Sequence, residues 1–330
     1  MDLVAIIINN TIVFDVPLLL VALGGMFSER SGTINIALEG IMIIGALIGC
    51  LVLKAFDASS FGSNHPQLAV LITILIASLA GGIYALLLGF AAIHLKADQT
   101  IGGTALNMLA PAFAIVLTWV IQGQGQTTIY IPRWVSIKPE TLGLAATAGQ
   151  GFFGTIIFKS CYLTTPITIL ILVASYIVLY KTKFGLRLRS CGEHPQASDS
   201  AGINVYKMRY IGVFISGLLG GLGGLAFTIA AGTGFTSNVA GYGFLALAVM
   251  IFGNWKPIQI LLASLLFAFF QTISSMASSI PFLPSFDKVN ESQYIYLMVP
   301  YIVTLIVLAF TSKKSRAPKA EGIPYDKGSR

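Results

Sequence analysis

Long apolar runs separated by short polar segments make up most of the chain. A helix that crosses the hydrocarbon core of a bilayer needs about 20 mostly apolar residues, and most of the runs reach that length. Two runs, 14–27 and 241–254, are too short to cross as straight helices, and residues 1–13 either lengthen the first or form a helix of their own. The pattern predicts an all-α, polytopic transmembrane helical bundle of about eight to ten spans. The predicted spans are 14–27, 34–53, 68–92, 100–121, 164–180, 209–231, 241–254, 257–279 and 293–311.

The composition supports a membrane protein. Of the 330 residues, 55% are hydrophobic and 10% are charged, whereas about 25% are charged in a typical soluble domain. A mean hydropathy of +0.83 over this length is too high for one soluble core with a polar surface. The N-terminus lacks the positive segment of a signal peptide, so the first run is expected to be an uncleaved membrane segment. Three cysteines have neither disulfide nor metal-ligand spacing, and no metal site is expected.

Positive charge is concentrated in two places. Six Lys or Arg residues lie between Lys181 and Arg209, and six more lie between Lys313 and Arg330. Both groups flank apolar runs, as the positive-inside rule expects of cytoplasmic segments, so the net charge of +7 is interpreted as a topology signal and not as a nucleic-acid site. The same alternation places 122–163 outside. The tail from residue 313 onward mixes charges with prolines and is predicted to be disordered.

Two similar segments lie 203 positions apart. Residues 35–40 and 238–243 share the pattern Asn, aliphatic, Ala, any residue, Glu or Tyr, Gly. Each follows a span and a break rich in Gly, Ser and Thr, and each leads into another apolar run. Corresponding interrupted segments in two halves are expected of inverted internal repeats, whose broken helices meet at the solute path. A chance match of six positions remains the alternative.

Charged residues beside the first break need partners, because ionised groups are costly inside a membrane. Glu29 and Arg30, with Gly32 after them, are predicted to form a structural pair that braces the break. Asn35 and Glu39 are four residues apart and share one face of a helix. They either hydrogen-bond a polar solute or cap backbone groups that the break leaves free.

The basic loop 185–203 is predicted to contain a short helix. Pro195 suits a first helical turn, Glu193 lies near the N-terminal end of the dipole, and Gly202 suits the stop. Membrane insertion does not require such a helix. A helix between two spans is well placed to dock on a soluble partner, and an ordinary basic loop is the alternative.

These segments resemble the permease subunits of ATP-binding-cassette (ABC) importers, in the branch that serves ribose-type sugars, nucleosides and branched-chain amino acids. Residues 23–40, LGGMFSERSGTINIALEG, are similar to the smaller of the two permeases in nucleoside uptake systems. Residues 192–205 and the glycine-rich stretch 216–224 are similar to the coupling-helix loop of the family and to the span that follows it. Residues 239–248 are a weaker match. His194 and residues 196–198 depart from the family pattern, which has Asn and an Ala-rich stretch there.

The resemblance implies one transmembrane permease domain, 1–312, with a cytoplasmic coupling loop, 181–209, an external segment, 122–163, and a cytoplasmic tail, 313–330. It also implies a bacterial inner membrane and a heteromeric importer with a second permease, a cytoplasmic ATPase and an external substrate-binding lipoprotein. The sequence has no Gly-x-x-x-x-Gly-Lys-(Ser/Thr) loop, so ATP–Mg is expected in the partner ATPase, and the chain is expected to be neither an enzyme nor a binder of its own cofactor. The implied coupling-helix residues are Glu193, His194, Pro195, Ala197, Asp199, Ala201 and Gly202.

The solute is expected to be neutral and polar, because spans 209–231 and 257–279 carry no chain of charged residues. A nucleoside fits, since its base stacks on aromatic rings and accepts hydrogen bonds from Asn or Gln. The candidates for lining the path are Asn35, Glu39, Asn107, Asn238 and Tyr242, although interhelical contacts are the common use of such residues.

Three alternatives stay open to different degrees. The first alternative, within the same family, is that the solute is a simple sugar such as ribose. The second, from a different class, is a secondary transporter driven by an ion gradient, which does not need the basic loop 185–209. A membrane-embedded enzyme is disfavoured, because His65, His94 and His194 lie in separate predicted loops and form no catalytic set.

Overall fold

The structure is a computed structural model that describes residues 2–139, 151–276, 298–299, 302–303, 305–306 and 316–327. Over these residues the chain is almost entirely helical and contains no β-strand. One isolated antiparallel bridge joins Ile129 and Phe235. The predicted all-α class and the polytopic helical bundle are confirmed.

Twelve α-helices and one 3₁₀ helix are described. They are α1 (Asp2–Arg30), α2 (Leu38–Ala58), α3 (Phe61–Asn64), α4 (Pro66–Ile93), α5 (Gln99–Gln122), η1 (Arg133–Val135), α6 (Gly151–Phe158), α7 (Thr164–Lys181), α8 (Lys183–Glu193), α9 (Pro195–Ser200), α10 (Val205–Ala231), α11 (Tyr242–Phe252) and α12 (Pro257–Ser275).

Seven of the described helices are long and apolar enough to cross a membrane: α1, α2, α4, α5, α7, α10 and α12. Residues 2–13 lengthen the first predicted span, because α1 runs without interruption from Asp2. The segment 241–254 forms only the eleven-residue α11, which is about 16 Å long and too short to cross the bilayer. Most of the predicted span 293–311 lies outside the described residues. The total of eight to ten spans therefore stays a prediction.

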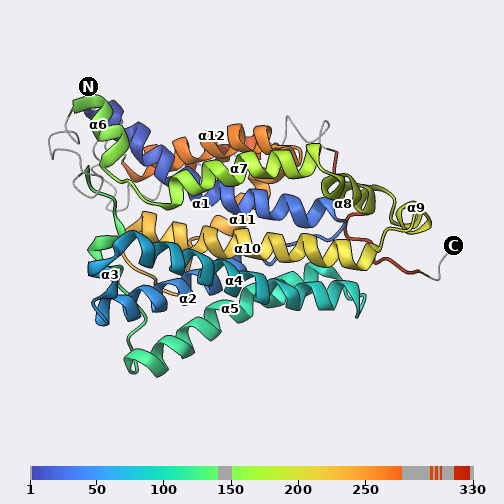
Figure 1. The fold of residues 1–330 in the computed structure, drawn as a ribbon, viewed down its shortest axis with the longest axis horizontal. Coiled ribbons are helices and arrows are strands. Elements are labelled where there is room, and N and C mark those ends of the chain that lie inside the picture. The colour runs from blue at the N-terminus through green and yellow to red at the C-terminus, as the bar shows by residue number, and fades with distance from the viewer. Residues whose placement is uncertain are drawn as a thin grey trace.

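Helix α10 lies at the centre of the bundle and packs against α1, α2 and α4 (Figure 1). Its glycine-rich face allows this close approach. A Cβ added at Gly221 would collide with the carbonyl oxygen of Ala77 and would lie 3.0 Å from the Cα of Gly81 on α4. Small residues at helix contacts are typical of membrane bundles, where close backbone packing substitutes for the hydrophobic effect. The glycine-rich stretch 216–224 is therefore a packing surface.

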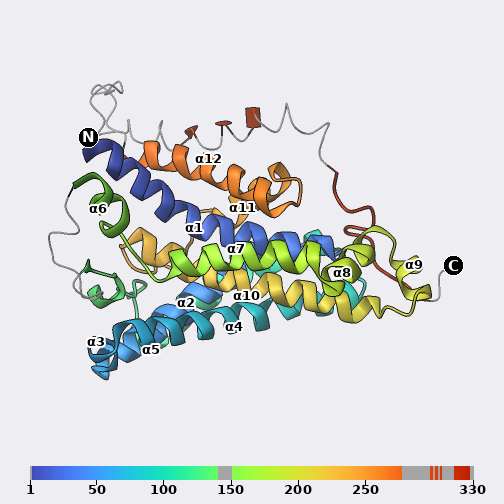
Figure 2. The same ribbon diagram turned by 45° about the horizontal axis from the view of Figure 1, so that its top comes forward.

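The two ends of the bundle differ. Figures 1 and 2 show α8, α9 and the described part of the tail at one end, and α3 and α6 at the other. The described parts of the predicted external segment, with η1 and α6, lie at the end opposite α9. The basic loop and the described part of the tail share the α9 end, as the charge pattern predicted for two segments on the same side.

The described part of the tail differs from the predicted disorder. Residues 316–327 pack against the α9 end of the bundle: Ala320 N donates to Gly192 O at 2.8 Å, and Arg209 Nη1 donates to Ile323 O at 2.9 Å. Tyr325 is buried, and its ring centroid lies 5.3 Å from that of Tyr206. Hydrogen bonds to its backbone and one buried ring hold the segment. Composition gives no sign of such contacts, and the disorder predicted for the rest of 313–330 stays a prediction.

Candidate functional site

The break between α1 and α2 is buried and is held by side chains of α5. Gly32 has a φ of +95°, which favours glycine at this position. Asn107 on α5 donates from Nδ2 to Ile36 O at 2.7 Å and accepts from Gly40 N at 2.7 Å. Gln99, also on α5, accepts from Ile34 N at 2.7 Å. Asn107 thus satisfies backbone groups that the break leaves without helical partners.

Glu39, at the start of α2, caps the start of α11. Its Oε1 accepts from Gly241 N at 2.9 Å and its Oε2 accepts from Gly243 N at 2.7 Å. Free backbone N–H groups and a partial positive charge mark the N-terminus of a helix, so a carboxylate there is favourable. The carboxylate thus caps a helix, but the groups that it caps belong to α11 and not to the α1–α2 break that the sequence analysis considered, and solute contact by Glu39 stays a prediction.

Glu29 and Arg30, at the end of α1, hold the turn that follows α11. The Trp255 indole donates to Glu29 Oε2 at 2.5 Å. Arg30 Nη2 donates to Trp255 O at 3.1 Å and to Asn254 O at 3.4 Å. The C-terminus of a helix has free carbonyl groups and a partial negative charge, so a guanidinium there is favourable. The sequence predicted that the two side chains pair with each other and brace the α1–α2 break, whereas these hydrogen bonds join both side chains to the α11–α12 turn.

The α1–α2 break therefore holds α11 at both ends. Glu39 binds its first turn, and Glu29 and Arg30 bind the turn after its last residue. The two similar segments 35–40 and 238–243 meet at Glu39 and Gly243, where a Cβ on the glycine would collide with the Glu39 backbone. This contact explains why position 243 is a glycine. It does not establish an internal repeat, which stays a prediction.

The other predicted path residues have different surroundings. Asn35 is buried and donates to Ser216 Oγ at 2.8 Å, and its Oδ1 has no partner among the described residues. Tyr242 is buried, with its ring centroid 4.5 Å from that of Phe227. Asn238 is exposed and accepts from Ala240 N within its own loop at 2.8 Å. The place of these residues on the solute path stays a prediction.

The basic loop folds into two helices that meet at a corner. Helix α8 ends at Glu193, and His194 turns the chain with φ −143° and ψ 84°. Pro195 occupies the first turn of α9, and Gly202, with φ +80°, follows its end, as predicted. Glu193 is the last residue of α8 and lies 3.9 Å from Arg30 Nη1. Glu193 therefore connects the α8–α9 corner to the α1–α2 break through Arg30, and it also lies just before the first turn of α9.

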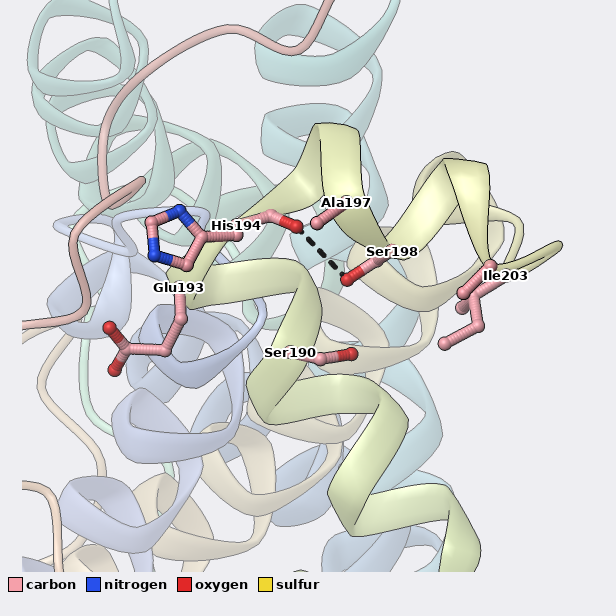
Figure 3. Close-up of a pocket in the computed structure, with 7 residues that line it drawn as sticks. Ser190, Glu193, His194, Ala197, Ser198 and Ile203 are labelled. Carbon is pink, nitrogen blue, oxygen red and sulfur yellow. Dashed lines mark hydrogen bonds between the residues drawn. The ribbon is translucent and has the colours of Figure 1, made fainter.

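The corner encloses a shallow groove of about 320 Å³. Figure 3 shows Ala197 and Ser198 of α9 and Ser190 of α8 around it, with Ser198 Oγ donating to His194 O at 3.1 Å. Ala201, after α9, is exposed and also lines the groove, whereas Asp199 does not. The groove lining is Ser190, Glu193, His194, Ala197, Ser198, Ala201 and Ile203.

The structure adds residues that the sequence analysis did not identify. Asp15 is buried within α1, and its Oδ1 has no hydrogen-bond partner among the described residues. An ionisable residue inside a predicted span was the available signal for it. Trp255 and the tail gave no such signal, because their partners lie more than 100 residues away along the chain.

Residues 7–308 match the protein family described as "Branched-chain amino acid transport system / permease component". The chain belongs to this permease family. The permease is 43% identical to "Guanosine ABC transporter permease protein NupQ" of Bacillus subtilis, over 100% of this chain and 99% of the relative. It is 40% identical to "Nucleoside ABC transporter permease protein NupC" of Lactococcus lactis, over 98% of this chain and 97% of the relative.

A more distant relative carries a different name. The permease is 26% identical to "Putative glucose ABC transporter permease protein TsgC13" of Haloferax volcanii, over 94% of this chain and 92% of the relative. No solved structure matches the chain. The predicted family is confirmed, and the apolar helices make the permease a multi-pass membrane protein.

Proposed function

We propose that this chain is the membrane-spanning permease subunit of an ATP-driven importer of nucleosides. The observation that carries the proposal is identity of 43% and 40%, along nearly the whole of each chain, with two permeases named for guanosine and for nucleosides. The assembly we propose has a second, homologous permease, a cytoplasmic ABC ATPase that binds ATP–Mg, and an external substrate-binding lipoprotein. The membrane is the inner membrane of a bacterium, with the tail and α9 in the cytoplasm.

The contacts at the α9 end support a route for mechanical coupling. Gly192 packs so closely on the end of α1 that an added Cβ would collide with Arg30 O. Arg30 in turn binds the carbonyl of Trp255. A rigid-body push on the α8–α9 corner by an ATPase would therefore reach the α1–α2 break, and through it α11.

The buried polar groups near the break suit an uncharged, polar solute. The Oδ1 of Asn35 has no donor among the described residues. Tyr242 lies in the segment that Glu39 binds, and its ring centroid is 4.5 Å from that of Phe227. A nucleoside offers N–H and O–H donors for the first and a flat base for the second. In this proposal Asn35 and Tyr242 contact solute, whereas Glu39 and Asn107 shape the path.

The test uses the purified importer with its ATPase, second permease and binding protein in lipid vesicles. We expect guanosine or other nucleosides to stimulate ATP hydrolysis, and ribose and glucose to leave it at the basal rate. Stimulation by a sugar alone would replace the proposal with the second candidate, a sugar permease. The Haloferax relative favours that candidate weakly, at 26% identity.

The same vesicles distinguish an ATP-driven importer from a secondary transporter. Uptake driven by an ion gradient, with no ATPase subunit present, would identify a secondary transporter and would overturn the ATP-driven mechanism. Uptake that requires both the ATPase and hydrolysable ATP would exclude that rival.

A further inference from the structure

A groove separate from the α1–α2 break lies between the end of α7 and the start of α12. It has a volume of about 550 Å³. Tyr176, Tyr180 and Lys181 of α7 line one side, and Lys256, Ile258 and Gln259 line the other. Helices α7 and α12 contact each other, and α7 ends and α12 begins here, toward the α9 end of the bundle (Figure 1).

The groove is positively charged. Lys181 and Lys256 are both exposed, and neither belongs to the two ion pairs found among the described residues. Arg189 adds a third cation, 4.9 Å from the centre of the Tyr180 ring. Among the described residues, the lining contains no carboxylate. The charges therefore complement an anion.

Exposed apolar side chains continue from the groove along both helices. On α7, Val173 and Ile177 are four residues apart and lie on the same face as Lys181. On α12, Ile258 and Leu262 are spaced in the same way, and Leu262 is 63% exposed. Tyrosine at the boundary between a charged end and an apolar face is typical of a membrane interface.

We infer that this groove binds one anionic phospholipid from the leaflet at the α9 end. Lys181 and Lys256 bind the headgroup phosphate, and the tyrosine hydroxyls and Gln259 hydrogen-bond the headgroup. The acyl chains lie along the apolar faces of α7 and α12. Basic grooves between spans are suited to acidic headgroups. A free phosphate ion would use the lysines but would gain nothing from the apolar faces below them.

The test compares lipids with identical acyl chains but different headgroups. The full chain, within its purified importer, is mixed with dioleoyl-phosphatidylglycerol or dioleoyl-phosphatidylcholine, and retained lipid is counted by native mass spectrometry. We expect one phosphatidylglycerol to be retained in preference to phosphatidylcholine. Lys181→Gln and Lys256→Gln are each expected to weaken this retention about fivefold. Lys207→Gln, an exposed lysine at the same end but outside the groove, is the matched control and should have no effect.

A second measurement locates the lipid without any substitution. A phosphatidylglycerol with a photoreactive acyl chain is expected to label peptides that contain 173–181 or 256–262. Equal retention of the two lipids, equal retention by the variants, or labelling elsewhere would overturn the inference. Competition by millimolar inorganic phosphate would show a plain anion site instead. A cross-link from Lys256→Cys to the second permease, with no lipid retained, would show that the groove is a subunit interface.

Discussion

A single carboxylate joins two segments that are about 200 residues apart in the chain. Glu39 accepts two backbone hydrogen bonds from the start of α11, and both donors lack any helical acceptor. The contact is buried, so water does not replace it. The position of α11 relative to the break therefore depends on the charge and on both oxygens of this side chain.

Substituting Glu39 by Gln tests that dependence. Gln offers one acceptor oxygen and turns its NH₂ group toward the second N–H, so one buried donor loses its partner. We expect the free energy of unfolding to fall by about 1–3 kcal/mol. Thermal unfolding of the purified chain in detergent measures it.

Glu193→Gln is the matched control for that experiment. Glu193 lies 3.9 Å from Arg30 and its side chain is 43% exposed, so its loss is expected to cost less than about 1 kcal/mol. Equal melting temperatures for both variants would show that Glu39 does not hold α11.

The sequence allowed two roles for the polar residues at the break but did not select between them. Asn35 and Glu39 were recognised by their spacing on one helix face. The choice between solute contact and capping depends on what faces them, and the partners of Glu39 come from α11. Asn107 shows the same limit, because its bonds to Ile36 and Gly40 cross from α5 to the break. Local spacing gives no information about such distant partners.

At the scale of helices, the glycine face of α10 determines how closely the central helices approach. Gly221 faces Ala77 and Gly81 of α4, and Gly45 of α2 packs against Gly221 in turn. Three helices thus meet at one glycine, and no side chain on α10 fits between the three backbones there.

Gly221→Ala is expected to separate α10 from α4 and to lower the free energy of unfolding by about 1–3 kcal/mol. Gly102→Ala on α5 is the control, because its added Cβ would find only Leu88 Cδ1, at 3.7 Å. Alanine is the better helix former by about 1 kcal/mol, so the control should melt at the same or a higher temperature. A Gly221→Ala protein as stable as the control would contradict the close packing of α10 on α4.

The docked tail is a second element whose stability can be tested, through pH. Burial raises the pKa of the Glu321 carboxyl, which lies beside that of Glu29. The docked tail therefore binds this proton more tightly than the free tail does. Docking is most favourable below the pKa of the free side chain, about 4.3, and weakens as pH rises through the raised value.

Amide hydrogen exchange at Ala320, whose N–H donates to Gly192 O, reports docking. After correction for the intrinsic exchange rate, we expect protection to fall as pH rises from about 4. Glu321→Gln mimics the neutral carboxyl and should remove the fall, whereas Lys319→Gln, an exposed neighbour, should keep it. Protection that rises with pH in the native chain would show that the charged carboxylate stabilises the docked tail.

At the scale of the whole molecule, apolar run length predicted the long helices, because crossing a bilayer imposes a minimum length on each of them. The positions of Pro195 and Gly202 predicted the bounds of α9 for a similar reason, since each restricts its own backbone. The docking of the tail and the hydrogen bonds of Arg30 to the α11–α12 turn were not predictable. Both depend on how distant elements pack, and a single sequence contains no direct record of that packing.

The corner between α8 and α9 gives the last prediction, which concerns the assembled importer. Ala197 is exposed and lines the groove at this corner. A glutamate there would place a charge without a partner in any tight protein contact, at a cost of about 2–5 kcal/mol.

We expect Ala197→Glu to reduce co-purification of the ATPase at least thirtyfold, because about 2 kcal/mol corresponds to that factor. The variant chain should keep its melting temperature, since the side chain is exposed. Asn64→Glu, at the last residue of α3 and at the opposite end of the bundle, is the control and should retain the ATPase. If Ala197→Glu binds the ATPase as well as the control does, this corner is not the docking site, and the coupling route through Gly192 and Arg30 loses its starting point.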